Sequence, residues 1–233
     1  MRTTLLVRSA ALRLSSLLVA VVPAVHSAAA TLEVSVVDEQ GRPIENVAVY
    51  AMPAHGAGEH GVSNEAVAHA AAPAIMDQQN LQFMPHLLVV QSGALVTFPN
   101  GDKVSHHVYS FSETKTFELS LYKGDVYPPV LFDRPGIVVL GCNIHDGMLG
   151  YVVVVDTPHF ARTNEQGVAL IDGVPNGDYA VTAWTPRVRP ASLPPARRVA
   201  VTQPGTVAAE IRIAGRLAPA HQHAASSLTW DRY

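Results

Sequence analysis

The sequence predicts an all-β protein, and three observations carry that prediction. Segments of alternating or continuous β-branched residues recur along the chain, as in TLEVSVVD (31–38) and YVVVVD (151–156). Glycine, proline and asparagine separate these segments at short intervals, as turns between strands require. Beyond the first 30 residues we find no apolar repeat of helical period.

The first 30 residues are of a different kind. A basic start is followed by a short apolar run, LLVAVVPAV (17–25), and by the small residues SAAA (27–30). The run is too short to cross a bilayer and Pro23 interrupts it, so residues 1–30 are predicted to be a secretory signal peptide. No later apolar run reaches spanning length. We therefore expect a periplasmic protein without stable membrane insertion.

The charge pattern excludes one class of partner. The formal net charge is −3, and removing the three arginines of the leader leaves 13 basic against 19 acidic residues, or −6. No block of lysine and arginine marks a phosphate-binding face, so we expect no nucleic-acid partner. The motifs of a nucleophile elbow, a zinc protease and a phosphate loop are also missing. We therefore do not expect an enzyme.

The strand signals follow one another with recognisable turns between them. YVVVVD is a continuous β-branched run, typical of a strand buried on both faces. Asn176-Gly177 is a strong tight-hairpin pair before an alternating strand. Two further hairpins are predicted, around the turn 39–45 and at Pro204-Gly205, and two strands are predicted around Ser92-Gly93.

Two segments, one on each side of the middle of the chain, share a sequence pattern that the middle lacks. VVDEQGRPIENVAV (36–49) and TNEQGVALIDGVPNGDYAV (163–181) each carry a polar Glu-Gln-Gly turn before a strand. They resemble the carboxypeptidase regulatory-like, transthyretin-like β-sandwich family. The resemblance implies one sandwich built from 31–52 plus 161–213, with a second β-domain, 73–157, inserted in it. The alternative is a single larger sandwich. Residues 214–233 are predicted to be a flexible tail.

The chain has a single cysteine, Cys142. Exported cysteines are normally paired in disulfides, so three interpretations remain: an inert buried thiol, an intermolecular disulfide or a metal ligand. His145 and Met148 follow it in the pattern C-x2-H-x2-M. Thiolate, imidazole and thioether are the donors that select copper over hard cations, which favours the metal ligand.

A blue-copper site needs a second histidine, because it consists of two imidazoles and a thiolate with a weak axial methionine. The stretch LVTFPNGDKVSHHVYSF offers His106 and His107 at the start of a strand. Adjacent strand residues point to opposite faces, so only one of the two readily faces a single ion.

Residues 83–112, with TFELSLYKG (116–124) and PGIVVLGCNIHDGMLGYVVVV (135–155), resemble the cupredoxin family, and the short ligand loop resembles that of the amicyanins more than that of the plastocyanins. The resemblance implies a Greek-key sandwich holding one copper ion, Cu(I)/Cu(II), through His106, Cys142, His145 and Met148. His106 is preferred because the family ligand precedes a polar residue and then an apolar strand. The family usually has Asn where His107 stands, so the bond that ties its two ligand loops together is left open.

The function that follows is periplasmic electron transfer, with a c-type cytochrome or a periplasmic dehydrogenase as partner. The resemblance implies an exit at His145 beneath an apolar patch, and we expect the run 137–140 and Leu149 to keep the sulfur dry. A second hypothesis is a copper chaperone that binds Cu(I) without redox cycling. It is supported by five further histidines that could bind copper: His55, His60, His69, His221 and His223. A third is a binding module in which the transthyretin-like part recognises a glycan or protein.

Overall fold

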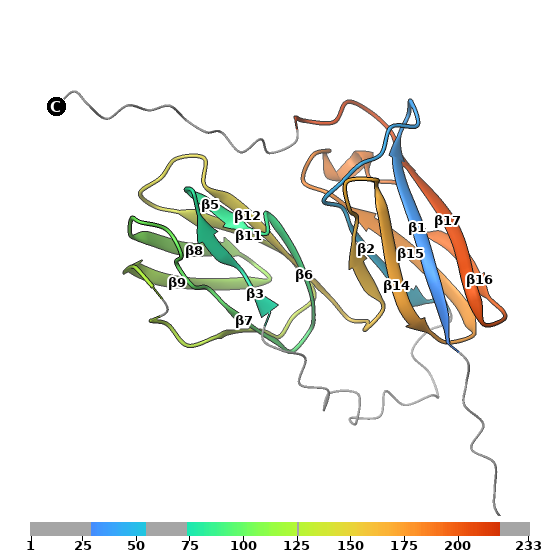
Figure 1. The fold of residues 1–233 in the computed structure, drawn as a ribbon, viewed down its shortest axis with the longest axis horizontal. Helices are drawn as coiled ribbons and strands as arrows, with labels where there is room; N and C mark the ends of the chain where they lie inside the picture. Colours follow the sequence, from blue (N-terminus) through green and yellow to red (C-terminus); the bar gives the residue numbers. More distant parts are fainter. Residues whose placement is uncertain (1–28, 55–73, 125, 220–233) are drawn as a thin grey trace, which may run out of the picture.

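The structure, a computed structural model, describes residues 29–54, 74–124 and 126–219, and over these residues the protein is all-β, as the sequence predicts (Figure 1). The strands in chain order are β1 Ala30–Asp38, β2 Ala48–Pro53, β3 Ala74–Ile75, β4 Asp77–Gln79, β5 Gln82–Met84, β6 Leu87–Gln91, β7 Ala94–Thr97, β8 His106–Ser112, β9 Lys115–Tyr122, β10 Val130–Phe132, β11 Gly136–Cys142, β12 Leu149–Val155, β13 Phe160–Arg162, β14 Val168–Val174, β15 Gly177–Trp184, β16 Arg197–Val201 and β17 Gly205–Ile213. The leader up to residue 28, the histidines of 55–73 and those of the tail lie outside the described residues.

Strands from both ends of the chain form two facing sheets, which we call the outer sandwich. One sheet has the order β14-β1-β17 and the other β13-β2-β15-β16. β1 alternates between buried and half-buried positions along its whole length, and Leu32, Val34 and Val36 are fully buried. This period-2 pattern explains why the segment forms a strand with one face in the core. The core itself is made by residues of 30–51 and 169–213.

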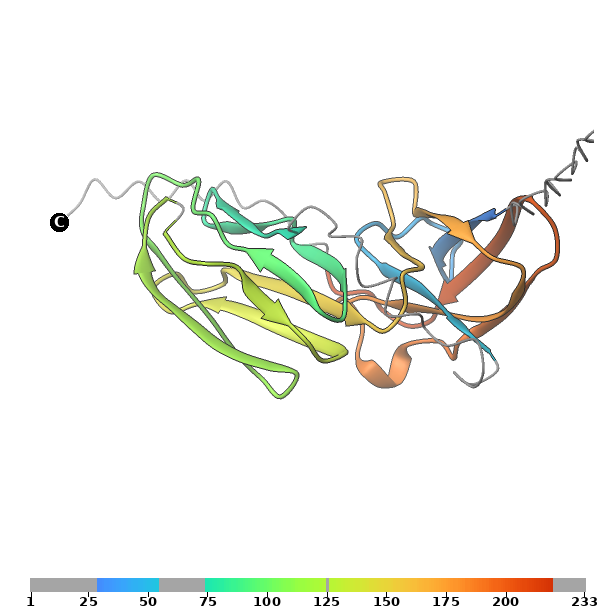
Figure 2. The same cartoon turned by 90° about the horizontal axis from the view of Figure 1, so that it is seen from below.

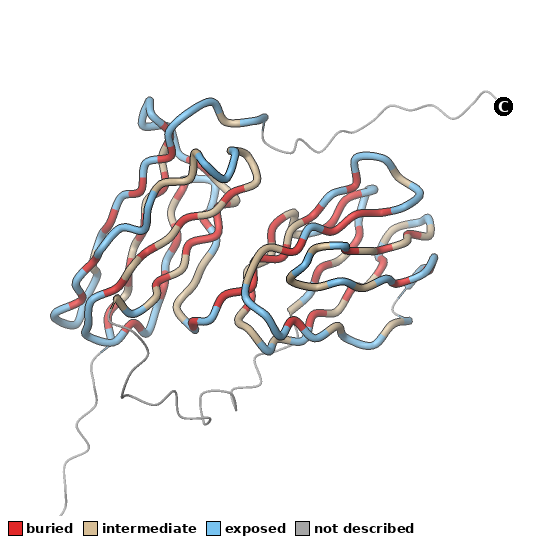
Figure 3. Tube along the Cα trace, turned by 180° about the vertical axis from the view of Figure 1, so that it is seen from behind, coloured by how far each residue is buried: buried red, intermediate tan, exposed pale blue. Residues whose placement is uncertain are grey.

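The strands β3 to β12 form a second set of sheets, the inner sandwich. A five-stranded sheet of order β6-β12-β11-β8-β9 faces a three-stranded sheet, β10-β7-β3, and the hairpin β4-β5 lies alongside. Its core gathers large aromatic and branched side chains, among them Phe83, Phe132, Val108 and Leu140. Figure 2 shows the two sandwiches next to each other along the long axis of the molecule. Figure 3 shows buried positions recurring along the strands of both sandwiches.

Strand β12 joins the two cores, because its two faces are buried in different places. Val152 and Val154 belong to the inner core, whereas Val153 and Val155 pack between the sandwiches, against Leu87 and other residues of β2, β6 and β15. The prediction that YVVVVD is buried on both faces is confirmed, and the second sandwich is the reason for the second buried face.

The chain leaves and re-enters the outer sandwich at one place. β2 and β13 are antiparallel neighbours, with Tyr50 opposite Phe160. Beyond that pair the backbone N–H of Ala51 donates to the carbonyl of His159 at 2.8 Å, and the Thr157 hydroxyl donates to the carbonyl of Ala51 at 2.8 Å. All the described strands between β2 and β13 in the chain belong to the inner sandwich.

The predicted hairpins are wrong, although the strands beside them are right. In each case the two strands lie in different sheets: β1 and β2, β14 and β15, and β16 and β17. The two strands predicted around Ser92-Gly93 are present as β6 and β7, and they also lie in different sheets. The turns carry the chain from one layer of a sandwich to the other, because both flanking strands have an apolar face that must cover the same core. A glycine with positive φ serves such a crossing as well as a hairpin, as Gly93 (φ 91°) and Gly205 (φ 121°) do.

Candidate metal centre

Three of the predicted ligands meet at one end of the five-stranded sheet. His106 begins β8, Cys142 ends β11, and His145 lies in the loop that follows. The two Nδ1 atoms of the histidines are 3.1 Å apart, and the sulfur of Cys142 is 3.7 Å from Nδ1 of His106 and 3.5 Å from that of His145. Among the described residues, His106, Cys142 and His145 are the one group of metal-binding side chains whose ligand atoms lie close enough together to hold an ion.

The size of this triangle can be compared with that of a trigonal metal site. Three donors at 120° around one ion, with metal–nitrogen bonds of about 2.0 Å and a metal–sulfur bond of about 2.3 Å, place the nitrogens about 3.5 Å apart and each nitrogen about 3.7 Å from the sulfur. The observed separations of 3.1, 3.5 and 3.7 Å differ from these by a few tenths of an ångström at most. The donor set and its spacing therefore fit a trigonal first-row metal ion.

Strand pairing positions the donors. β8 and β11 are antiparallel, with Cys142 opposite Val108, so the cysteine lies next to the strand that carries His106. Just beyond the pair, the backbone N–H of Asn143 donates to the carbonyl of His107 at 3.3 Å. The link between the ligand loops, left open by the histidine at position 107, is thus made by the main chain.

The two adjacent histidines point to opposite faces of β8. His106 is fully buried beside Cys142, whereas Nε2 of His107 lies 2.9 Å from Oε1 of Glu118 on the neighbouring strand. Strand alternation accounts for the difference. The structure therefore brings His106, and not His107, to the cluster.

Met148, the fourth predicted ligand, is buried in the same core as Cys142. Its backbone N–H donates to the carbonyl of His145 at 3.2 Å, which closes the ligand loop into a turn. Gly147 takes a positive φ of 82° within that turn, a conformation that glycine adopts without a Cβ penalty. The loop thus returns the chain to the core directly after His145.

A fifth residue, Asp102, was missed from the sequence. Its Oδ2 lies 3.1 Å from Nε2 of His106, the ring nitrogen that faces away from the cluster. Burial by itself would raise the pKa of Asp102, but hydrogen bonds from the Leu81 backbone, the His106 ring and the Lys103 backbone outweigh it and hold the pKa below its usual value. The aspartate stands in a turn-like N-G-D sequence, where its residue type needs no further explanation.

The histidine nearer the surface is held in the form that binds metals. Burial lowers the pKa of His145, the neighbouring His106 lowers it further, and Asp102 opposes both. A neutral imidazole offers a lone pair to a metal, and an imidazolium does not. The electrostatics of the cluster therefore favour coordination at neutral pH.

The apolar surroundings differ in part from the expectation. Within the run 137–140 only Val138 and Leu140 face the core, because the strand alternates. Leu149, at the start of β12, is 41% exposed, and Ile144 in the ligand loop is 51% exposed. Gly147 is exposed as well, so all three residues of the predicted apolar patch are at the surface.

In the part of the chain that the structure describes, no helix is long and apolar enough to cross a bilayer.

Comparisons with known proteins return solved structures only. A scan against family models gives no match, and a search of curated proteins gives none either. The novel purple cupredoxin from Nitrosopumilus maritimus is 23% identical (TM-score 0.31) over 35% of this chain and 96% of its own. An oxidised amicyanin mutant is 22% identical (TM-score 0.34) over 39% and 89%. The Cu-containing nitrite reductase of Thermus scotoductus is 22% identical (TM-score 0.35) over 36% of this chain and 23% of its own.

Proposed function

We propose that this protein is a periplasmic electron carrier with one mononuclear type 1 copper ion. His106, Cys142, His145 and Met148 would hold the ion through two imidazole nitrogens, a thiolate and a thioether. The observation that carries the proposal is the triangle of two imidazole nitrogens and one sulfur with sides of 3.1 to 3.7 Å. Two histidines and a cysteine with an axial methionine are the donor set of electron-transfer copper sites.

Copper in such a site supplies one-electron chemistry, as Cu(I) and Cu(II). The protein's part is to hold the donors still. His106 and Cys142 lie on paired neighbouring strands, and the Asn143–His107 backbone bond fixes the start of the ligand loop. Because the ladder resists movement of these side chains, little rearrangement accompanies a change of charge. The buried positions of Cys142 and Met148 exclude water from the sulfurs.

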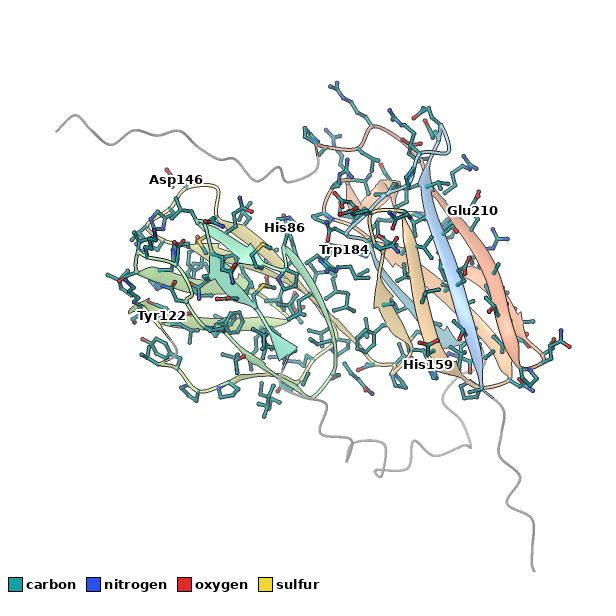
Figure 4. All side chains as sticks on the ribbon, in the orientation of Figure 1. His86, Tyr122, Asp146, His159, Trp184 and Glu210 are labelled. Carbon is teal, nitrogen blue, oxygen red and sulfur yellow. The ribbon has the colours of Figure 1, made fainter. Side chains whose placement is uncertain are left out.

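Electrons enter and leave, in this proposal, at His145. It is the least buried of the three clustered side chains, and the exposed Ile144 and Leu149 beside it offer an apolar contact surface. Figure 4 labels Asp146 on the same loop, at the end of the inner sandwich far from His159 and the outer sandwich, so a partner can approach. A c-type cytochrome or a periplasmic dehydrogenase is the proposed partner.

Burial also weighs against the other hypotheses. A chaperone hands its ion to another protein and needs accessible soft ligands, whereas Cys142, Met148 and His106 are all buried. A copper enzyme needs an open coordination position, and four protein donors leave none. Electron transfer is therefore favoured over copper delivery and over catalysis.

The test is the visible absorption spectrum of the mature protein loaded with Cu(II). We expect an intense thiolate-to-copper band that is lost in Cys142→Ser and in His106→Ala. The matched control is His107→Ala, which removes the adjacent imidazole and should keep the band. A protein that retains Cu(II) without such a band would refute the type 1 site. A band without a reversible one-electron potential would refute the carrier.

A further inference from the structure

His106 is the one fully buried imidazole of the cluster, and both of its ring nitrogens have neighbours. Nδ1 faces the sulfur of Cys142 and Nδ1 of His145, while Nε2 lies 3.1 Å from Oδ2 of Asp102. A carboxylate accepts hydrogen bonds and cannot donate them when ionised. The proton of the neutral ring is therefore held at Nε2, which leaves the lone pair at Nδ1 directed at the cluster.

The carboxylate of Asp102 is itself held in place. Oδ2 also accepts the backbone N–H of Leu81 at 2.8 Å, and Oδ1 accepts that of Lys103 at 2.8 Å. The backbone N–H of Asp102 donates to Oδ1 of Asn100 at 2.9 Å, and Nδ2 of Asn100 donates to the carbonyl of Tyr122 at 2.9 Å. The side chain of Asp102 is 14% exposed. It is thus fixed to the turn that carries Leu81 and, through Asn100, to Tyr122 at the end of β9.

One of these anchors comes from a strained turn. Asn80 (φ 55°) and Leu81 (φ 60°) both take the left-handed conformation in the two-residue turn between β4 and β5. Such turns usually carry glycine at the second of these positions, and left-handed backbone is costly for a residue with a Cβ. Strain of this kind persists where the surroundings determine the conformation. Here the turn directs the Leu81 N–H at the carboxylate that holds His106.

We propose that Asp102 is a positioning residue that sets the tautomer of His106 and lowers the reduction potential of the copper site. The inference rests on the proposed copper function. A carboxylate that accepts the outer N–H of a metal-bound imidazole makes the coordinating nitrogen a stronger donor. A stronger donor, together with a nearby negative charge, stabilises Cu(II) more than Cu(I). The β4-β5 hairpin contributes to the positioning of His106, because its Leu81 N–H holds the Asp102 carboxylate in place.

The first test is independent of copper. Nitrogen NMR of the histidine rings in the metal-free protein should show His106 with its proton at Nε2, and a mixture of both tautomers in Asp102→Asn. An unchanged tautomer in Asp102→Asn overturns the positioning role, whatever the metal site does.

The second test is the reduction potential of the loaded protein. Asp102→Asn should raise it enough to shift the Cu(I)/Cu(II) ratio at a fixed applied potential by about tenfold or more, which is about 59 mV for a one-electron couple. We expect the affinity for Cu(II) to fall by about 10- to 100-fold. Asp146→Asn is the matched control: it removes the same charge from the exposed ligand loop, whereas the carboxylate bonded to His106 is that of Asp102, and it should shift the potential much less.

Equal shifts in the two variants would overturn the positioning role, because the carboxylate would then act through its charge alone. If Asp102→Asn does not fold, Asp102→Glu retains the charge on a longer side chain and should shift the potential in the same direction; an unchanged potential in that variant would overturn the inference. Failure of the wild-type protein to form the thiolate-to-copper band refutes the proposed function and leaves the tautomer experiment in force.

Discussion

Two glycines flank the ligand loop, and the same substitution at each should have different effects. Gly141 precedes Cys142 on β11, and Gly150 follows Met148 on β12. A Cβ on Gly150 would lie 2.8 Å from Cβ and 3.0 Å from Cγ of Phe83, which is fully buried. A Cβ on Gly141 would lie 2.8 Å from Cζ and Oη of Tyr109, the far end of a half-buried ring that can swing outward.

The magnitudes follow from these neighbours. Forcing a methyl group into a packed core costs about 1–3 kcal/mol, and replacing glycine by alanine returns about 0.4–1 kcal/mol through the unfolded chain. Gly150→Ala should therefore lose about 1.5 kcal/mol of unfolding free energy, which is about 3–6 °C in Tm for a chain of this size. Gly141→Ala should stay within about 0.5 kcal/mol of the wild type, because its strain is relieved by movement of Tyr109.

The assay is calorimetry of the metal-free protein, with the visible band expected under the proposed function as a check on the ligand loop. Adding Tyr109→Ala to Gly141→Ala removes the contact altogether and should change Tm by no more than Tyr109→Ala alone does. An equal loss in the two glycine variants, or no loss in Gly150→Ala, would show that the packing around the loop does not set the cost.

Three further predictions concern the metal, the pH and the contact between the sandwiches. Cu(II) at 100 times its dissociation constant should raise the unfolding free energy by about 2.7 kcal/mol, reversibly on chelation, and calorimetry that finds no shift contradicts a site formed only in the folded chain. Burial lowers the pKa of His159 below its ordinary 6.5, so the unfolded chain binds a proton that the folded chain does not, and stability falls as the pH drops through about 6.5. Denaturation measured from about pH 7.5 to 5.5 should therefore show a shallower fall in stability for His159→Gln than for the wild type. Equal slopes for the two proteins would refute this. Val153→Asp places an unpaired charge between the sandwiches; thermal unfolding should then separate into two transitions, and one unchanged transition would mean that this contact does not couple them.

Much of the candidate site could be predicted because its signals are local. Cys142, His145 and Met148 lie within one stretch of seven residues, and the choice of His106 over His107 depends on the alternation of one strand. The double burial of β12 could also be predicted, since only a strand with two apolar faces needs an unbroken run of valine.

The pairing of strands could not be predicted in the same way. A turn with glycine or proline is compatible with a hairpin and with a crossing between layers, and the choice depends on which core the next strand must cover. Asp102 was missed for a related reason. Its contact with His106 depends on how the turn before β8 folds back on the ring, and on the Leu81 N–H supplied from a separate hairpin. Neither the fold of this turn nor the position of the Leu81 N–H can be recognised from the spacing of residues in the sequence.

The pairing of β2 with β13 bears on how such a chain can change over evolution. Because Tyr50 lies opposite Phe160 and Ala51 is hydrogen-bonded to residues 157 and 159, a chain that ran directly from one strand to the other would form an ordinary short hairpin. The residues that fill the outer core all come from outside 54–157. The inner sandwich could thus be gained, exchanged or deleted at this point as if it were a change in loop length. The outer core would be undisturbed, and only the contact with Val153 and Val155 would have to be covered anew.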